Sequence, residues 1–446
     1  SATSSTYTLV AADVGNPISC VVTGTNSYGN ASANSNSTAN VAPTTPGAPT
    51  IGTATSTGET TATVAYTAPA SNGGSIITLY TATSTPDSIT GTLSQAGSGT
   101  ISVGGLTPAS TYSFTVKATN SVGNGSPSTS SNTITTDSPP AGPKKAIFGF
   151  GFISTGEVSI TNIVSYTGVV SSDVTNISPR ARGGVAAASY GGDKAIFGFG
   201  YVQTSNTYVN TNNLVSNTGV VASNTTVSRG TGRYALAAAT YGGDKAIFGF
   251  GYVDSPVLPK PNYKGMTNLV SNTGVVASDV APVGQARFGV AGAGYGTDKG
   301  IFGFGNYSGN LRTLNLVSNT GIVAANSSTV GATARYAPGA ASYGGDKAIF
   351  GYGYVSATVM LSVSNLVSNT GIMAADTAGV GTARYGLSGA SYGGNKAIFG
   401  YGNAGTGIGV VSMTNLVTNM GVVASDTTGV GTARSFIGAA GFSSTI

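Results

Sequence analysis

The chain is 446 residues long, enough for about three domains, and only 7% of its residues are charged, with a formal net charge of +5. It contains no His, which excludes Ser–His and Cys–His nucleophilic catalysis and most zinc sites. The Lys and Arg residues are dispersed along the chain, so the basic balance does not indicate a nucleic-acid partner.

Hydrophobic residues make up 40% of the chain, and its 22 Tyr and 15 Phe recur in register. This pattern favours an all-β protein with many tight turns over a disordered low-complexity chain. The longest apolar stretches are strand-sized and interrupted by Gly, so the sequence predicts no transmembrane helix and no insertion into a membrane.

The first segment, residues 1–43, carries the pattern of a half-buried strand, because Ile18, Cys20 and Val22 alternate. It resembles the last three strands of an immunoglobulin-like sandwich, on the motif Asp13, Gly15, Cys20, Asn26 and Gly29. We therefore interpret it as a partial immunoglobulin-like domain, its C-terminal half. Half a sandwich cannot bury its inner face, so we expect either a fragment of a longer chain or pairing of this segment with another. In the fragment interpretation Cys20 is a small buried hydrophobic residue.

Residues 44–138 contain three candidate strands, at 62–69, 76–80 and 106–123. They resemble a fibronectin type III module on a motif of eight residues: Leu106, Pro108, Tyr112, Phe114, Val116, Ala118, Asn120 and Gly123. The resemblance implies that Tyr112 is the corner tyrosine of that family and that Tyr66 occupies the place of its core Trp. Such modules are mostly spacers, and the fold alone supports no activity.

Residues 139–446 are built from a repeat of about 50 residues. The strand Lys-Ala-Ile-Phe-Gly, with one alteration, begins at Lys145, Lys194, Lys245, Lys299, Lys347 and Lys396. A strand of small residues follows an arginine at Arg182, Arg233, Arg287, Arg335, Arg384 and Arg434. With a Gly-Gly-Asp hairpin and an Asn-Thr-Gly turn, each unit predicts four short antiparallel strands, as in a propeller blade. The pattern resembles the kelch repeat, although Trp is absent and Phe-Gly-Phe-Gly replaces the usual Gly-Gly.

The two strand types are offset along the chain, which predicts a closed ring. The array starts on a second strand and ends after a first strand, so pairing residues 434–442 with 145–151 would complete a sixth blade without an open edge. A linear solenoid is the alternative, but it would need atypical caps at its ends. We therefore predict a six-bladed, kelch-like β-propeller closed by the C-terminal strand.

Two repeated residue types have alternative interpretations. The six arginines could line a central channel and bind an anion, but we expect each guanidinium to tie a blade to its neighbour through backbone carbonyls or an Asp. The aspartates of the hairpin turns, Asp193, Asp244, Asp298 and Asp346, could ligate calcium, but calcium needs six or more oxygen ligands and Asn395 breaks the series. We expect turn geometry to explain them, and predict no metal and no cofactor.

Variable stretches follow the second strand of each unit and emerge on one face of the predicted ring. Loops on a rigid scaffold often carry binding residues, although drift explains their variability equally well. Three of these loops, 203–211, 254–265 and 306–312, supply the candidate partner or glycan-binding residues: Tyr208, Lys260, Tyr263, Lys264, Tyr307 and Arg312. Tyrosine offers a flat ring and one hydroxyl for stacking on a sugar or side chain.

The combination of modules and the low charge resembles structural proteins of tailed bacteriophages. It implies a non-enzymatic virion protein, a tail or capsid fibre or decoration, exposed on the virion surface and contributing to host attachment or surface glycan binding. The alternative is an extracellular or cell-surface bacterial adhesin or lectin-like module. Expected partners are other virion proteins, a host surface glycan, and a second copy of the chain through the N-terminal modules. An enzyme such as a polysaccharide lyase is disfavoured by the sparse acids, with only Glu59 and Glu157 as glutamates.

Overall fold

The computed structural model describes residues 6–138, 142–175, 180–254, 262–356 and 358–443. The chain forms two compact units, Ser1–Pro139 and Pro140–Ile446. Among the described residues the helices are two short 3-10 turns, η1 (Ala11–Asp13) and η2 (Gln203–Ser205), and neither has the length or apolar character of a membrane crossing. Every other regular element is a strand, so the predicted all-β class is confirmed.

The N-terminal segment contains one hairpin of two exposed strands, β1 (Val21–Asn26) and β2 (Gly29–Asn34). Val22 is 66% exposed, and Cys20 is exposed as well. The expected burial of Cys20 is therefore not found in this chain, because no described segment packs over that side of the hairpin.

The next segment folds into two facing antiparallel sheets. Tyr66 and Tyr80 meet in its core, with ring centroids 4.2 Å apart. The hydroxyl of Tyr112 accepts a hydrogen bond from the Thr107 amide at 3.0 Å, the upstream main-chain contact expected of a corner tyrosine. In spatial order the sheets are β3 (Thr50–Ser56), β4 (Thr61–Thr67) and β7 (Gly99–Gly104), and β6 (Thr90–Leu93), β5 (Leu79–Thr85), β8 (Thr111–Thr119) and β9 (Ile134–Thr135).

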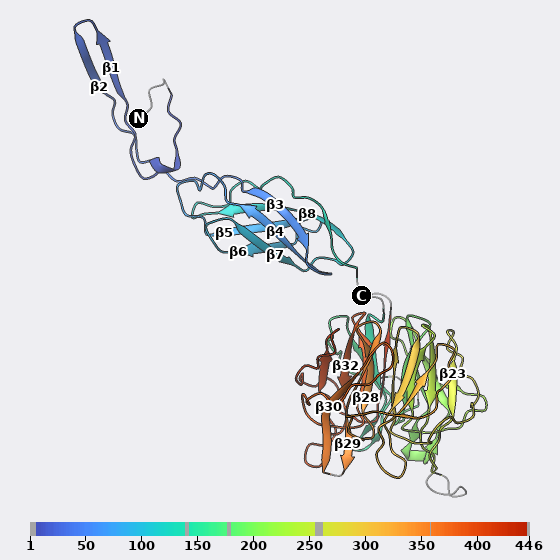
Figure 1. Ribbon diagram of the computed structural model, residues 1–446. Coiled ribbons are helices and arrows are strands. Elements are labelled where there is room, and N and C mark those ends of the chain that lie inside the picture. Colours follow the sequence, from blue (N-terminus) through green and yellow to red (C-terminus); the bar gives the residue numbers. More distant parts are fainter. Residues whose placement is uncertain (1–5, 139–141, 176–179, 255–261, 357, 444–446) are drawn as a thin grey trace. The chain divides into compact units, whose positions relative to one another are not determined.

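The second unit, coloured from teal through yellow to red in Figure 1, consists of six antiparallel sheets, the blades of a closed ring. Blades are numbered by the order of their Lys-Ala-Ile-Phe-Gly strands. In each blade the strand of small residues pairs with this strand, and the Asn-Leu-Val strand (Asn-Ile-Val in blade 1) lies on its other side. Blades 1 to 3, in pairing order, are β34 (Gly438–Phe442), β10 (Lys145–Gly149), β13 (Ile160–Val164), β14 (Val174–Thr175); β15 (Ala186–Tyr190), β16 (Lys194–Gly198), β19 (Thr211–Val215), β20 (Thr225–Thr226); and β21 (Ala237–Tyr241), β22 (Lys245–Gly249), β23 (Thr267–Val270). Blades 4 to 6 are β24 (Ala291–Tyr295), β25 (Lys299–Gly303), β26 (Thr313–Val317), β27 (Ser327–Ser328); β28 (Gly339–Tyr343), β29 (Lys347–Ser356), β30 (Val359–Val367); and β31 (Ser388–Tyr392), β32 (Lys396–Gly400), β33 (Thr414–Val417).

Two small hairpins extend blades 1 and 2 beyond the second strand. They are β11 (Phe152–Ile153) with β12 (Gly156–Glu157), and β17 (Tyr201–Val202) with β18 (Thr207–Tyr208). In blade 5 the same extension is continuous with β29 and β30, which pair with register shifts. These extensions lie where the sequence predicts variable loops.

Ring closure occurs in blade 1, where the last strand pairs with the first one of the unit. β34 pairs antiparallel with β10 from Lys145↔Phe442 to Gly149↔Gly438. Blade 2 has the equivalent register, from Tyr190↔Lys194 to Ala186↔Gly198, within a continuous stretch of chain. The predicted six-bladed propeller, closed by the C-terminal strand, is therefore confirmed.

Aromatic side chains pack across each blade boundary. Phe150 of blade 1 meets Phe197 of blade 2 with ring centroids 5.0 Å apart and an interplanar angle of 66°. Tyr401 of blade 6 meets Phe148 of blade 1 at 5.2 Å, so the contact also spans the closure. Such edge-to-face pairs contribute about 0.5–1.5 kcal/mol each beyond their area burial. The other four boundaries repeat the contact, as Phe199–Phe248, Phe250–Phe302, Phe304–Phe350 and Tyr352–Phe399.

Removal of residues 434–446 tests the closure. The deletion would expose one edge of β10, an apolar strand without an acidic residue, and we expect it to pair with other chains. Size-exclusion chromatography with light scattering should then show aggregates where the intact chain is monodisperse. A soluble truncated chain that melts at the temperature of the intact one would contradict closure by β34.

Candidate functional site

Each blade is preceded by an arginine whose guanidinium is fully buried. Arg182 Nε donates to the Phe199 carbonyl at 2.7 Å, and its Nη2 donates to Asn213 Oδ1 at 2.6 Å, both within blade 2. The guanidinium carbon lies 4.4 Å from the ring centroid of Phe150 in blade 1. Burial lowers the pKa of Arg182 to about 9, which leaves it charged at neutral pH. The other five residues repeat the Asn and ring contacts: Arg233, Arg287, Arg335, Arg384 and Arg434.

The same arginines also join the blades through their main chain. The carbonyl of Arg182 accepts a hydrogen bond from the Gly151 amide of the preceding blade at 3.0 Å, and an equivalent bond crosses each of the other boundaries. All six side chains have no exposed surface, so they cannot form an anion-binding ring in the channel. Each arginine does connect two blades, as expected, but not through hydrogen bonds of its guanidinium, which bind groups of its own blade. The contact with the preceding blade consists of the aromatic ring against the guanidinium and the main-chain hydrogen bond.

A second polar cluster fastens the outer part of each blade. In blade 1, Asn162 Nδ2 donates to Asp173 Oδ1 at 2.9 Å, and Asp173 Oδ2 accepts from the hydroxyl of Thr432 at 2.6 Å. Burial acts to raise the pKa of Asp173, but the hydrogen bonds from Thr432 and Asn162 outweigh it and hold the pKa below its usual value. Blades 3, 5 and 6 repeat the Asn–Asp contact, and blades 2 and 4 have Asn in place of Asp: Asp279, Asp376, Asp426, Asn224 and Asn326.

The hairpin aspartates make turn contacts, as expected. Asp193 Oδ1 lies 2.8 Å from Lys194 Nζ, and its Oδ2 accepts from Asn217 Nδ2 at 3.2 Å. The carbonyl of Asp244 accepts from the Gly191 amide of the preceding blade at 2.7 Å. Within the described ranges, no group of three or more His, Cys, Asp or Glu is placed to hold a metal ion.

The central channel is closed at one mouth by a ring of backbone hydrogen bonds. One residue from each blade has a left-handed φ between 50° and 65°, and its amide donates to the carbonyl of its counterpart in the preceding blade at 2.6–3.0 Å. The residues are Gly184, Ala235, Gly289, Ala337, Gly386 and Phe436. Added bulk is not tolerated at Gly184, where a Cβ would lie 2.7 Å from the ring of Tyr234.

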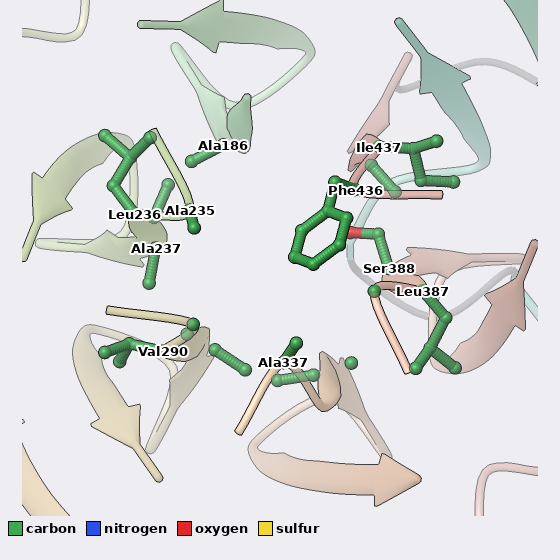
Figure 2. A pocket seen from close by; sticks show the side chains of 18 of the residues that line it. Ala186, Ala235, Leu236, Ala237, Val290, Ala337, Leu387, Ser388, Phe436 and Ile437 are labelled. Carbon is green, nitrogen blue, oxygen red and sulfur yellow. The ribbon is translucent and has the colours of Figure 1, made fainter. Parts of the chain in front are cut away.

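Phe436 differs from its five counterparts because it carries a large side chain. Figure 2 shows its ring pointing into the middle of the channel, whereas Leu236, Leu387 and Ile437 point toward the blades. The cavity at this level has a volume of about 70 Å³, enough for about two water molecules. This level of the channel therefore offers no room for a ligand of sugar or nucleotide size.

Aromatic side chains surround this closed mouth in an uninterrupted circuit. Neighbouring ring centroids in the circuit lie 5.6–6.4 Å apart, within the usual range for aromatic pairs. The circuit is Phe152, Tyr201, Tyr234, Tyr252, Phe288, Tyr336, Tyr385 and Phe436, and four more rings contact it directly or through one another: Tyr208, Tyr263, Tyr307 and Tyr354. We call this set the aromatic crown.

Three of the predicted site residues belong to the crown. Tyr263 stacks on Phe288 with centroids 5.3 Å apart and an interplanar angle of 4°, and it lies 5.4 Å from Tyr307, which is 41% exposed. Tyr208 contacts Tyr252 at 6.3 Å.

The basic candidates follow the crown tyrosines along the chain. Lys264 is half-buried and Arg312 is exposed, while Lys260 lies outside the described residues. The structure thus connects the three predicted tyrosines through aromatic contacts. Of the predicted basic residues, Lys264 lies in blade 3 and Arg312 in blade 4.

Burial raises the pKa of several crown tyrosines, of Tyr234 to about 12, and of Tyr208, Tyr263 and Tyr385 as well. The hydroxyls of these four residues therefore stay protonated over the whole physiological pH range and can both donate and accept a hydrogen bond. The crown is thus a surface of aromatic rings and hydroxyls.

Sequence reasoning missed most of the crown because it assigned the aromatics of the repeat to blade boundaries. That assignment holds for the phenylalanines of the second strand. Apart from Phe436, the missed residues follow one of two signals, an aromatic directly after the repeat arginine or directly after the second Gly of Gly-x-Gly. They are Tyr234, Phe288, Tyr336 and Tyr385 for the first signal, and Phe152, Tyr201, Tyr252 and Tyr354 for the second.

Comparison with known proteins establishes one domain. Residues 47–134 match the fibronectin type III domain. Among solved structures, the chain is similar to YjhT, with 11% identity and a TM-score of 0.45 over 65% of this chain and 99% of that chain. It is also similar to a crystal structure of domains from titin, with 26% identity and a TM-score of 0.20, over 26% of this chain and 40% of that chain. These TM-scores are too low to carry an argument, and a search of curated proteins returned no match.

Replacing Arg434 by Met should destabilise the propeller. The change leaves two buried acceptors, the Phe150 carbonyl and Asn162 Oδ1, without their donor, and each unsatisfied acceptor typically costs about 1–3 kcal/mol. Urea unfolding followed by near-ultraviolet circular dichroism would measure the shift in midpoint. The matched control is Arg312→Met at an exposed arginine, with an expected change within about 0.5 kcal/mol. Equal effects of the two changes would contradict the structural role of Arg434.

Acid should weaken the propeller below about pH 4. The pKa values of Asp173, Asp376 and Asp426 are lower when folded than when unfolded, so their stabilisation is present above the unfolded pKa of about 3.9 and is lost as the pH falls through the folded values. The melting temperature should stay nearly constant from pH 5 to 8, because the chain has no His. The triple change of these aspartates to Asn, the residue found in blades 2 and 4, should reduce the loss of melting temperature in acid. An unchanged profile would contradict this assignment.

Proposed function

We propose that the protein is a non-enzymatic structural protein of a tailed-phage virion, a tail or capsid fibre or decoration exposed on its surface, and that it contributes to host attachment through the aromatic crown. The crown carries the proposal, since it is a continuous aromatic surface on a rigid ring, and Tyr is enriched where proteins bind partners. The fibronectin type III domain supports a spacer role for the first unit.

The closed channel and the engaged carboxylates support binding rather than catalysis. A propeller enzyme would need an accessible cavity, and the cavity beside Phe436 holds only about 70 Å³. Acid–base hydrolysis of a glycoside needs two free carboxyl groups at a defined separation. In this ring Asp173 is bonded to Thr432 and Asn162, and Asp193 is paired with Lys194.

The second candidate function is a bacterial cell-surface adhesin or lectin-like module. The same crown favours it, because stacking on sugars needs neutral rings and protonated hydroxyls. The two candidates differ in location and genome context, so the genes that flank the reading frame would separate them. In either case we infer that the partner is a host glycan or another surface protein, and that a homo-oligomer would form through the first unit.

Replacing Tyr263 and Tyr307 by Ala tests the crown as the contact face. Each change should weaken binding of the labelled full chain to intact host cells by at least about 1 kcal/mol, as at interface hot spots, because each removes a ring from the crown. Flow cytometry across a concentration series would measure the change, with the melting temperature nearly unaffected. The matched control is Tyr28→Ala in the exposed N-terminal hairpin, at a tyrosine that is 97% exposed.

Removal of the first 138 residues completes this test. If binding survives both crown changes but disappears with this deletion, attachment belongs to the N-terminal modules and the proposal for the crown is wrong.

A further inference from the structure

The crown contains two hollows, at places where the repeat departs from its aromatic pattern. The position after the repeat arginine is aromatic in four blades but is Gly183 in blade 2. The position after the second Gly of Gly-x-Gly is Asn403 in blade 6, where blades 1, 2, 3 and 5 have an aromatic residue. Beside each of these two departures lies an open cavity walled by crown tyrosines.

The first hollow, near Gly183, has a volume of about 340 Å³. Its walls are the rings of Phe152, Tyr201, Tyr208 and Tyr234, and Gln203 supplies an exposed amide at the rim. Tyr201 and Tyr208 lie 4.9 Å apart at 40°, so they form two walls at an angle rather than a flat stack.

Hydrogen bonds hold the rim of this hollow. The hydroxyl of Tyr201 donates to Asn206 Oδ1 at 2.9 Å, which fixes the outer end of its ring. Glu157 and Arg180 lie close along the rim but are engaged by Thr204 and Ser205, at 2.8 and 2.6 Å. The hollow is therefore preformed, and one carboxylate oxygen of Glu157 and the guanidinium of Arg180 are each bonded to a hydroxyl of the 204–205 segment.

The second hollow, between blades 5 and 6, has a volume of about 380 Å³. Tyr354 and Tyr385 form its aromatic walls, with centroids 5.2 Å apart at 62°. Asn403 Oδ1 accepts a hydrogen bond from the Gly405 amide at 2.8 Å, which orients the Asn403 amide group. The exposed hydroxyl of Thr406 completes the polar side.

The chemistry of the two hollows matches an uncharged sugar residue. Their volumes are at the lower end of the usual range for small-ligand sites, about 300–1,000 Å³. A pyranose presents apolar C–H faces, which stack on aromatic rings, and hydroxyls, which bond amides and hydroxyls. Tyrosine is the only ionisable residue type that lines either hollow, so nothing there would compensate the charge of an acidic sugar.

We propose that the Tyr201–Tyr208 and Tyr354–Tyr385 hollows are two subsites for neutral sugar residues of a surface polysaccharide. The inference rests on the proposed function, in which the crown is the contact face, and narrows the partner to an uncharged saccharide. Tyr263 and Tyr307, which have Lys264 and Arg312 beside them in sequence, do not line either hollow and remain part of the wider contact face.

Surface plasmon resonance of the full chain over immobilised polysaccharides tests this proposal. The neutral probes are dextran, mannan and galactan, and the acidic probes are alginate and polygalacturonate. At least one neutral probe should bind and both acidic probes should bind at least fivefold more weakly. Tyr201→Ala and Tyr354→Ala should each weaken neutral binding at least fivefold, and their combination should abolish it. The matched control is Tyr28→Ala, which removes a 97% exposed tyrosine outside the crown and should leave neutral binding within twofold.

A second pair of changes guards against loss of folding. Gln203→Ala and Thr406→Ala alter exposed rim residues only, so the fold is retained, and each should weaken neutral binding about threefold. The chain has 22 Tyr and no Trp, so saturable perturbation of tyrosine fluorescence by the neutral probe gives an independent readout in the unmodified chain.

The outcomes separate this inference from the proposed function. Absence of binding to every neutral probe, a preference for the acidic probes, or neutral binding that falls only with Tyr263→Ala or Tyr307→Ala overturns the two subsites. If cell binding still needs Tyr263 and Tyr307 and resists periodate oxidation of the cell-surface sugars, the crown contacts a protein and only the saccharide inference fails. If no crown change affects cell binding, both fail.

Discussion

Six guanidinium groups of the propeller are removed from water, and a buried cation is tolerated only when its donors find acceptors within the protein. Arg182 meets this demand through the Phe199 carbonyl and Asn213, which belong to neighbouring strands of one blade. Its flat face covers the ring of Phe150 in the blade before, and its carbonyl accepts from Gly151 there. One residue thus links the strands within a blade and each blade to the next. Every unit repeats the asparagine, ring and main-chain contacts, so the ring closes only if the last unit meets the first in the same way, as Arg434 does with Phe150 and Asn162.

Because each buried arginine requires the same partners in every unit, few positions of the propeller are available for a binding site. The arginines, their asparagines and the second-strand phenylalanines are committed to the ring in all six units, and the backbone bonds at the mouth closed by Phe436 leave space for little more than water there. A binding surface must therefore use positions that the ring does not need. The crown positions are not needed by the ring, because they carry Tyr, Phe, Asn or Gly in different blades and the ring closes all the same. Departures such as Gly183 and Asn403 are informative because they change the shape of the surface without changing the ring.

The repeat geometry could be predicted from the sequence because the same strand motifs occur in all six units. The count and offset of the Lys-Ala-Ile-Phe-Gly and arginine strands were sufficient to predict the blade number and the pairing of residues 434–442 with 145–151, although not its register, which runs from Lys145↔Phe442 to Gly149↔Gly438. The crown was only partly predictable. Tyr208, Tyr263 and Tyr307 stand out as aromatics in variable loops, whereas Tyr234 and Tyr385 lie within the repeat, where a pattern alone cannot separate a ring that packs between blades from one that lies at the channel mouth. The exposure of Cys20 was not predictable either, since a strand pattern indicates a buried side without saying whether a second layer covers it.

Phe436 shows how closure affects the symmetry of the ring. Its φ of 50° lies in the left-handed region, where a bulky residue costs about 1–3 kcal/mol and persists only if the surroundings hold it. Two backbone bonds do so, from its amide to Gly386 at 2.6 Å and from the Gly184 amide to its carbonyl at 2.8 Å. The second bond joins chain segments about 250 residues apart, so it forms only in the closed ring. The ring of Phe436 then lies between Phe152 and Tyr385 and completes the crown in blade 1, the one blade whose strands come from both ends of the unit. Closure of the propeller and continuity of its aromatic surface therefore depend on the same residue.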